Sequence, residues 1–157
     1  MTEGAVTMPV LTDQVRNQLS QVFAARLDAP VTLQLFTQQA SPIGPPTLPC
    51  ETCQDTEALL REVAALSAHV TLAVRDFVAD ERDARGLGVD RIPAMVFQGR
   101  NKGVMRYFGV PAGYEFTVLV EGLIDAARGA TALSAATRER VATLASPIHI
   151  RVLVTPT

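Results

Sequence analysis

Apolar residues recur first at helical and then at strand spacing. From Asp13 to Leu27 the spacing is three and four residues, which predicts a helix with one apolar face. Thr12 is a suitable N-cap, and Ala29-Pro30 follows the end of this helix. Across Val31–Thr37 the apolar positions alternate, which predicts a strand. Phe36 lies among the outward positions of that strand, so we expect a strand covered on both faces.

Proline interrupts the pattern after this strand. Residues 38–49 contain Pro42, Pro45, Pro46 and Pro49, a density that excludes a helix or a central strand and predicts an extended, stiff loop. The loop leads directly to Cys50. From about Cys50 to Ala68 the apolar spacing is helical again, and acidic residues occupy the first turns, as the helix dipole favours.

The following segments continue the alternation of strands and helices. The patterns predict strands over 70–74, 94–98 and 104–108, and helices over 80–87 and 115–128. From Val31 to Arg128 the order is therefore strand, helix, strand, helix, strand, strand, helix. This order predicts an α/β fold with a mixed sheet. Helical crossovers imply parallel pairing between some of the first three strands, and the last two form an antiparallel hairpin.

A further helix and strand pattern follows Gly129. Residues 134–144 have a helical pattern with Ser134 as the N-cap. From Ile148 to Val154 apolar and polar positions alternate, which predicts a strand. Such a strand has an apolar face and unpaired backbone groups. We therefore expect it to join an edge of its own sheet or to pair with a second chain.

Composition and charge narrow the classes of protein. The chain has 157 residues, of which 48% are apolar and 19% charged, enough for one domain with a sizeable core. Its net charge of −2 gives no basic surface for nucleic acid. No apolar run reaches the roughly 18 residues of a membrane span. The first residues lack the features of a signal peptide, so a cytoplasmic protein is expected.

Both cysteines belong to a single Cys50-Glu51-Thr52-Cys53 motif. On a helix, positions three residues apart share a face, so a small adjustment allows a disulfide. Cys50 would lie at the positive end of the helix dipole, which can lower the pKa of a thiol below its free value of about 8.5. Cys53, one turn further, would be shielded. This arrangement predicts Cys50 as the nucleophile of thiol–disulfide exchange and Cys53 as the resolving thiol.

The pair has two other interpretations. The cysteines could be buried structural residues without redox chemistry, although their place between a strand, a loop and a helix favours a redox pair. They could also be half of a zinc site. The other imidazoles, His69 and His149, are far apart in sequence, so zinc would have to bridge two chains, and we expect no metal.

Longer motifs add a family resemblance to the cysteine spacing. They are Asp76-Phe77, the stretch Gly-Val-Asp-Arg-Ile-Pro-Ala at 88–94 and the stretch Arg-Tyr-Phe-Gly-Val-Pro-Ala-Gly-Tyr-Glu-Phe at 106–116. With the cysteine motif they resemble the protein disulfide oxidoreductases built from two thioredoxin-like units, within the thioredoxin–glutaredoxin superfamily. The resemblance implies a thioredoxin-like three-layer sandwich with a four-stranded mixed sheet, an extra N-terminal helix and a C-terminal helix–strand extension.

The resemblance also implies site residues and partners. Pro93 matches the family's cis-proline, and Ile92 would offer backbone groups to an extended substrate. The implied activity is exchange of the Cys50–Cys53 pair with protein disulfides, without a metal or nucleotide cofactor. A flavoprotein reductase would recharge the pair. The alternatives are a non-catalytic thioredoxin-like interaction module and a redox-docking domain of a peroxiredoxin-reducing system.

The direction of electron flow stays open. The spacer carboxylate Glu51 opposes a thiolate on Cys50, whereas the helix dipole favours it. The strand Val31–Thr37 has no acidic residue where thioredoxins carry a buried carboxylate, so proton handling at Cys53 is unassigned. Three activities of the Cys50–Cys53 pair are therefore kept as alternatives: oxidation, reduction and isomerisation of disulfides.

The resemblance divides the chain near Gly129. Residues 1–129 correspond to one thioredoxin-like unit, and 130–157 to the helix and strand that would begin a second. We expect the chain to be a first unit with the start of another. We also expect a homodimer through the strand from Ile148 to Val154, by two-fold symmetry.

Overall fold

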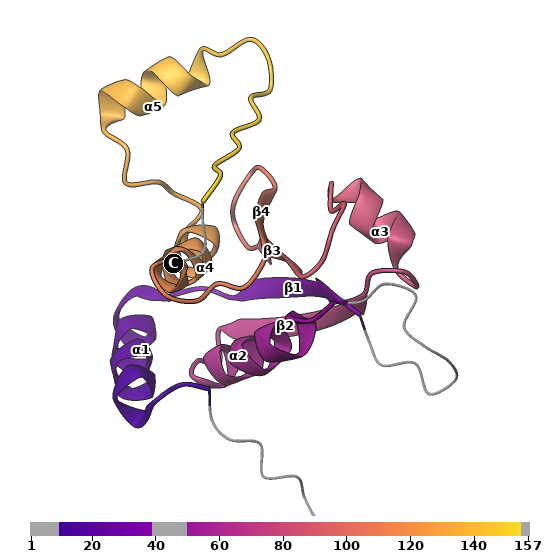
Figure 1. The fold of residues 1–157 in the computed structure, drawn as a ribbon. Helices are drawn as coiled ribbons and strands as arrows, with labels where there is room; N and C mark the ends of the chain where they lie inside the picture. The colour runs from indigo at the N-terminus through magenta and orange to yellow at the C-terminus, as the bar shows by residue number, and fades with distance from the viewer. Residues whose placement is uncertain (1–9, 39–49, 155–157) are drawn as a thin grey trace, which may run out of the picture.

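The computed structural model describes residues 10–38 and 50–154 (Figure 1). The proline-rich loop predicted after the first strand lies, from residue 39 to 49, outside the described residues. The helices are α1 (Asp13–Arg26), α2 (Cys53–Ala65), α3 (Glu81–Gly86), α4 (Glu115–Arg128) and α5 (Ala135–Ala142). The strands are β1 (Val31–Thr37), β2 (Val70–Asp76), β3 (Ala94–Gln98) and β4 (Met105–Phe108).

The four strands form one mixed sheet in the order β2-β1-β3-β4. β1 and β2 are parallel, with Val31 opposite Val70 and Thr37 opposite Asp76. β3 is antiparallel to β1, and β4 is antiparallel to β3. The predicted α/β class, strand order along the chain and hairpin are therefore confirmed, and the parallel pairing is confined to β1 and β2.

Both faces of the sheet are covered, which makes three layers. The main core joins one face to α1, α2 and α4, and Leu33, Leu35, Phe97 and Leu123 are buried in it. A smaller cluster lies on the other face, where α3 contributes Ala84. Phe36 is fully buried in this second cluster, as its place on the strand predicted. In Figure 1, α2 and α3 lie on opposite sides of the sheet.

Several predicted boundaries shift by a few residues. α2 begins at Cys53 instead of Cys50, because residues 51 and 52 form a turn before the first helical residue. It ends at Ala65 because the next amides bond to carbonyls three residues back, Leu66 to Val63 and Ser67 to Ala64. β2 is longer than predicted, since its last two residues continue the parallel ladder with β1.

The segment after Gly129 departs from the prediction. Gly129 ends α4 with φ 64°, and an added Cβ there would lie 2.5 Å from the Cβ of Arg100. Ser134 caps α5 as predicted, because its hydroxyl accepts from the Thr137 amide. The predicted strand from Ile148 to Val154 is wrong for the described chain. These residues pair with neither sheet edge, so no strand forms, and every residue from 130 to 154 is exposed.

Charged groups tie the segment before α1 to α2. Glu62 accepts the amides of Val10 and Leu11 at 2.7 and 3.0 Å, and the guanidinium of Arg16 at 2.7 Å. Burial opposes the charge on Glu62, but these donors outweigh it, so the pKa of Glu62 lies below its ordinary value. The N-terminal helix is therefore fixed to the helix that carries Cys53. No helix in the described ranges has the length and apolarity of a membrane span.

We predict that Glu62→Gln lowers the free energy of unfolding by about 1–2 kcal/mol at pH 7, because charged hydrogen bonds are lost. The pKa of Glu62 is depressed in the folded state, so its stabilisation is present above the ordinary value of 4.5 and is lost as the pH falls through the folded value. Urea unfolding at pH 7 and pH 3.5 checks this. Glu57→Gln, at an exposed pair with Arg61 on the same helix, is the control and should change little. A Glu62→Gln loss that is equal at both pH values would contradict the prediction.

Candidate active site

The two cysteines form a disulfide at the start of α2. The Cys50 and Cys53 sulfurs are 2.01 Å apart, and the Cα atoms are 5.5 Å apart. The closed pair accounts for both cysteines of the sequence. The Cys-x-x-Cys motif singled out from the sequence is therefore a disulfide-bonded pair, as its spacing allowed.

The two sulfurs belong to residues of different exposure. Cys50 lies just before the turn that leads into α2 and is half-buried, whereas Cys53 is the first residue of α2 and is only 2% exposed. The prediction that both cysteines lie on the helix is wrong for Cys50, because Thr52 is the N-cap. Cys50 is nevertheless the more exposed of the two cysteines.

The N-terminus of α2, next to Cys50, has backbone amides that no side-chain cap satisfies. The first amides of a helix have no partner within the helix, and the Thr52 side chain forms no cap hydrogen bond. Cys50 directly precedes this positive end of the dipole, which stabilises a thiolate. Exposed Glu51 and the first-turn residue Asp55 are negative charges close in sequence that act against it.

Buried threonine hydroxyls occur where β1 ends and α2 begins. Thr56 is fully buried, and its hydroxyl donates to the Thr52 carbonyl at 2.7 Å. Thr37, the last residue of β1, is 1% exposed, and its Oγ1 has no hydrogen-bond partner within the described chain. The sequence interpretation missed Thr37. Its signal was a polar residue at an inward position of a strand that otherwise alternates apolar residues inward.

The Ile92–Pro93 peptide bond is cis, as the family resemblance implied. Pro93 directly precedes β3, and in the register Ala94 lies opposite Phe36 at the end of β1. Pro93 therefore lies at the sheet end from which the chain leaves towards Cys50. Its carbonyl accepts the Gly109 amide at 2.9 Å. Ile92, by contrast, has no backbone hydrogen bond to any residue in the described ranges.

Charged and aromatic side chains flank Ile92. The Arg91 guanidinium lies 5.4 Å from the centroid of the Phe108 ring, within cation–π range. Arg91 also donates to Asp90 at 2.8 Å, and this hydrogen bond holds the pKa of Asp90 below its ordinary value. Arg151 of the C-terminal segment lowers that pKa further. The side of the site next to Ile92 is therefore lined by an exposed, paired arginine.

The described residues contain no group of three or more potential metal-ligating side chains. His69 and His149 are both exposed. A zinc ion would need the two cysteines as thiolates, but in this structure their sulfurs are joined in a disulfide.

The fold and the cysteine pair together define a thioredoxin-like protein with a Cys-x-x-Cys disulfide. No family model matches the sequence, and no curated protein is significantly similar to it. Solved structures do match. One is the alkylhydroperoxide reductase protein AhpF of Enterococcus faecalis, with 22% identity and a TM-score of 0.70, over 85% of this chain and 61% of that chain.

Two further structures have the same fold. A protein disulfide oxidoreductase from Aeropyrum pernix is 26% identical, with a TM-score of 0.69, over 85% of this chain and 55% of that one. The NTD_N/C domain of AhpF from E. faecalis is 21% identical, with a TM-score of 0.67, over 83% and 59%. The chain thus spans less than two thirds of each. These matches confirm the thioredoxin-like fold and agree with the disulfide oxidoreductase family expected from the sequence.

We predict that Cys50 is alkylated before Cys53 once the disulfide is reduced, because Cys53 is 2% exposed. A short pulse of iodoacetamide on the folded, reduced protein, followed by peptide fragmentation in a mass spectrometer, locates the label. In urea both cysteines should react at similar rates, which is the control. Preferential labelling of Cys53 in the folded protein would contradict the assignment.

Proposed function

We propose that the protein is a thiol–disulfide oxidoreductase that acts on protein disulfides through Cys50 and Cys53. The observation that carries this proposal is the asymmetry of the pair. One cysteine is accessible beside an uncapped helix terminus, and the other is buried one turn away and bonded to it. Thiol–disulfide exchange needs this division between an attacking and a resolving thiol.

The chemistry runs in two exchanges when the pair acts as a reductant. The Cys50 thiolate attacks one sulfur of the substrate disulfide, a Cys50–substrate disulfide forms, and the other substrate sulfur leaves as a thiolate. The Cys53 thiolate then attacks the Cys50 sulfur and closes the Cys50–Cys53 disulfide, releasing the second substrate thiolate. Two electrons pass from the pair to the substrate. The reverse sequence oxidises a substrate dithiol.

We propose that the substrate lies along Ile92. The amide and carbonyl of Ile92 are unused within the described chain and lie next to a cis-proline at the sheet end from which the chain leads to Cys50. Backbone groups of this kind can pair with an extended peptide as a strand would, and such pairing is tolerant of side-chain sequence. This assigns Ile92 and Pro93 to substrate binding and Cys50 and Cys53 to catalysis.

The proposed partners are protein disulfides and a reductase that restores the dithiol. A flavoprotein reductase would recharge the oxidised pair in a cytoplasmic setting. A second candidate function is service in a peroxiredoxin-reducing system, which is favoured by the fold similarity to the alkylhydroperoxide reductase protein AhpF. Activity that depends on a peroxiredoxin and is absent with other protein disulfides would select this second function.

We expect Cys50→Ser to abolish reduction of insulin disulfides by dithiothreitol to the level of a protein-free blank, because the attacking sulfur is lost. Cys53→Ser is the matched variant. It keeps the attacking thiol but not the resolving one, so a covalent Cys50–substrate disulfide should accumulate on a non-reducing gel. Retention of insulin reduction by Cys50→Ser would refute the proposed function.

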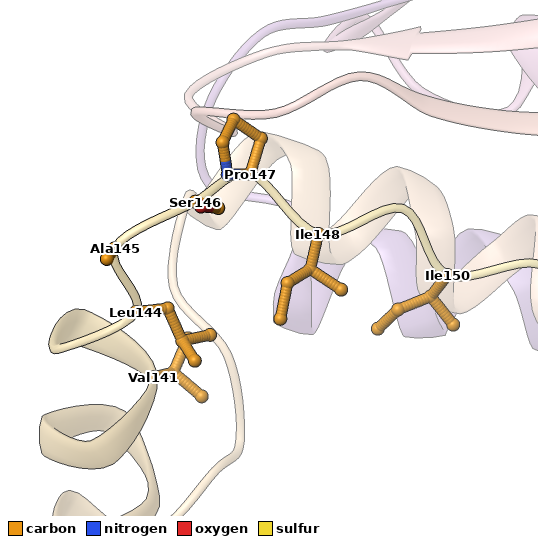
Figure 2. A pocket seen from close by; sticks show the side chains of 7 residues that line it. All are labelled: Val141, Leu144, Ala145, Ser146, Pro147, Ile148 and Ile150. Carbon is orange, nitrogen blue, oxygen red and sulfur yellow. The ribbon is translucent and has the colours of Figure 1, made fainter.

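We further propose that residues 130–154 are a separate association segment that pairs with a second copy of the chain. Ile148 and Ile150 are 62% and 82% exposed, and they alternate with polar residues without any strand partner in the described chain. In Figure 1, α5 stands away from the sheet. Figure 2 shows Val141 and Leu144 of this segment facing the same hollow as Ile148.

Charge favours a second copy as the occupant. Residues 130–157 contain three arginines and one glutamate, although acidic residues outnumber basic ones by 16 to 14 in the whole chain. A basic segment and an otherwise acidic chain are complementary between two copies. An open hollow of about 610 Å³ bordered by these apolar side chains would be covered in such a pair.

Deletion of residues 148–157 should convert the protein from a dimer to a monomer, as measured by light scattering, because the alternating apolar face is removed. Ile150→Lys should weaken the dimer, whereas Arg151→Lys should keep it. An unchanged mass after the deletion would contradict the association proposal.

A further inference from the structure

The unpaired hydroxyl of Thr37 has no structural explanation in the disulfide form. It is 1% exposed and lacks a hydrogen-bond partner within the described ranges. A buried hydroxyl without a partner has lost its hydrogen bonds to water without replacement, which destabilises the fold. Valine would fill nearly the same volume without that cost. A threonine at this position is explained if its hydroxyl has a partner in another state of the protein.

Strand geometry directs Thr37 towards α2. Successive side chains of a strand alternate between faces, so Thr37 shares a face with Leu33 and Leu35. Those two leucines are buried in the cluster that also contains Leu60 of α2. The Thr37 side chain therefore belongs to the layer between the sheet and α2.

Chain direction brings Thr37 opposite the first turn of α2. β1 and β2 are parallel and α2 connects them, so α2 runs back along the sheet and begins where β1 ends. From Leu35 to Thr37 the strand advances about 6.6 Å. From Leu60 back to Thr56 the helix advances about 6 Å in the same direction, so Thr37 is level with the first turn of α2. Cys53 lies one turn beyond Thr56 on the same buried side of the helix.

Cys53 is the group near this position that changes state. Thr56 already uses its hydroxyl on the Thr52 carbonyl. The Cys53 sulfur is bonded to Cys50 in the disulfide form and becomes a thiol or thiolate when the bond opens. A freed, buried sulfur is a far better acceptor as a thiolate than it is within a disulfide.

We propose that Thr37 donates a hydrogen bond to the Cys53 sulfur in the reduced protein and has no partner in the oxidised protein. This inference rests on the proposed function, because it assigns a role within the same redox cycle. When an external thiolate attacks the Cys50 sulfur, the Cys50–Cys53 bond breaks and its electron pair stays on Cys53. The Thr37 hydroxyl then stabilises that thiolate, which a proton from solvent later neutralises.

A hydroxyl that is satisfied only after reduction favours the reduced state. Thr37→Val should therefore stabilise or leave unchanged the oxidised protein and destabilise the reduced protein. The equilibrium of the pair with glutathione should shift about tenfold towards the disulfide. For a two-electron couple this is about 30 mV towards a more negative potential.

The experiment measures that equilibrium by thiol trapping in glutathione buffers for the wild type and three variants, with urea unfolding of both redox forms. Thr37→Ser keeps a hydroxyl and should restore the wild-type equilibrium. Thr56→Val removes a hydrogen bond present in this structure. It should lower the stability of both forms without moving the equilibrium. A Thr37→Val protein that loses stability equally in both forms, with an unmoved equilibrium, would overturn the proposal.

A second comparison does not depend on exchange activity. In a Cys50→Ser background, Cys53 is the only thiol, and its pKa is measured by the ultraviolet absorbance of the thiolate. Adding Thr37→Val, or Thr37→Ala, should raise that pKa because a donor to the thiolate is removed. An unchanged pKa would overturn the role of Thr37. If the pKa rises but the wild type reduces no protein disulfide, the hydrogen bond stands and the proposed function fails.

Discussion

The site depends on the parallel pairing of β1 and β2 through the connecting helix α2. Parallel strands require a crossover, and the crossover helix must start at the end of the sheet where β1 finishes. The antiparallel register of β3 then places the Ile92–Pro93 peptide at that same end. Strand pairing therefore brings these segments, which are distant in sequence, to the end of the sheet where β1 finishes. Glu62 holds α1 and the residues before it against α2.

Burial distinguishes the two cysteines of the pair. Cys53 is buried on α2, whereas Cys50 is half-buried and lies outside the helix. Charge near the pair is mixed, since the uncapped end of α2 favours a thiolate and acidic residues oppose it. Because these surface charges oppose each other, the buried hydroxyls of Thr37 and Thr56 gain weight. A hydrogen bond or charge interaction away from water is stronger than one at the surface.

Periodicity predicted β1, β3 and α4 with their observed bounds, because each presents an apolar face to a core within this chain. The start of α2 was missed, since Cys50 and Glu51 are compatible with both a helix and a turn. The C-terminal pattern failed for another reason. Alternation indicates which side of a strand is apolar but not whether a partner edge is present. Thr37 was missed although its polar side chain breaks the run of apolar inward positions in β1, because only the packing shows that its hydroxyl is buried without a partner in the described chain.

The central claim is that the Cys50–Cys53 disulfide works in redox exchange and is not a structural link. Titration of the wild-type pair against glutathione buffers, with the folded state followed by circular dichroism, tests this most directly. The account predicts reversible two-electron reduction at a potential between about −270 and −120 mV without unfolding. A pair that is reduced only below about −300 mV, or only as the protein unfolds, would contradict the account.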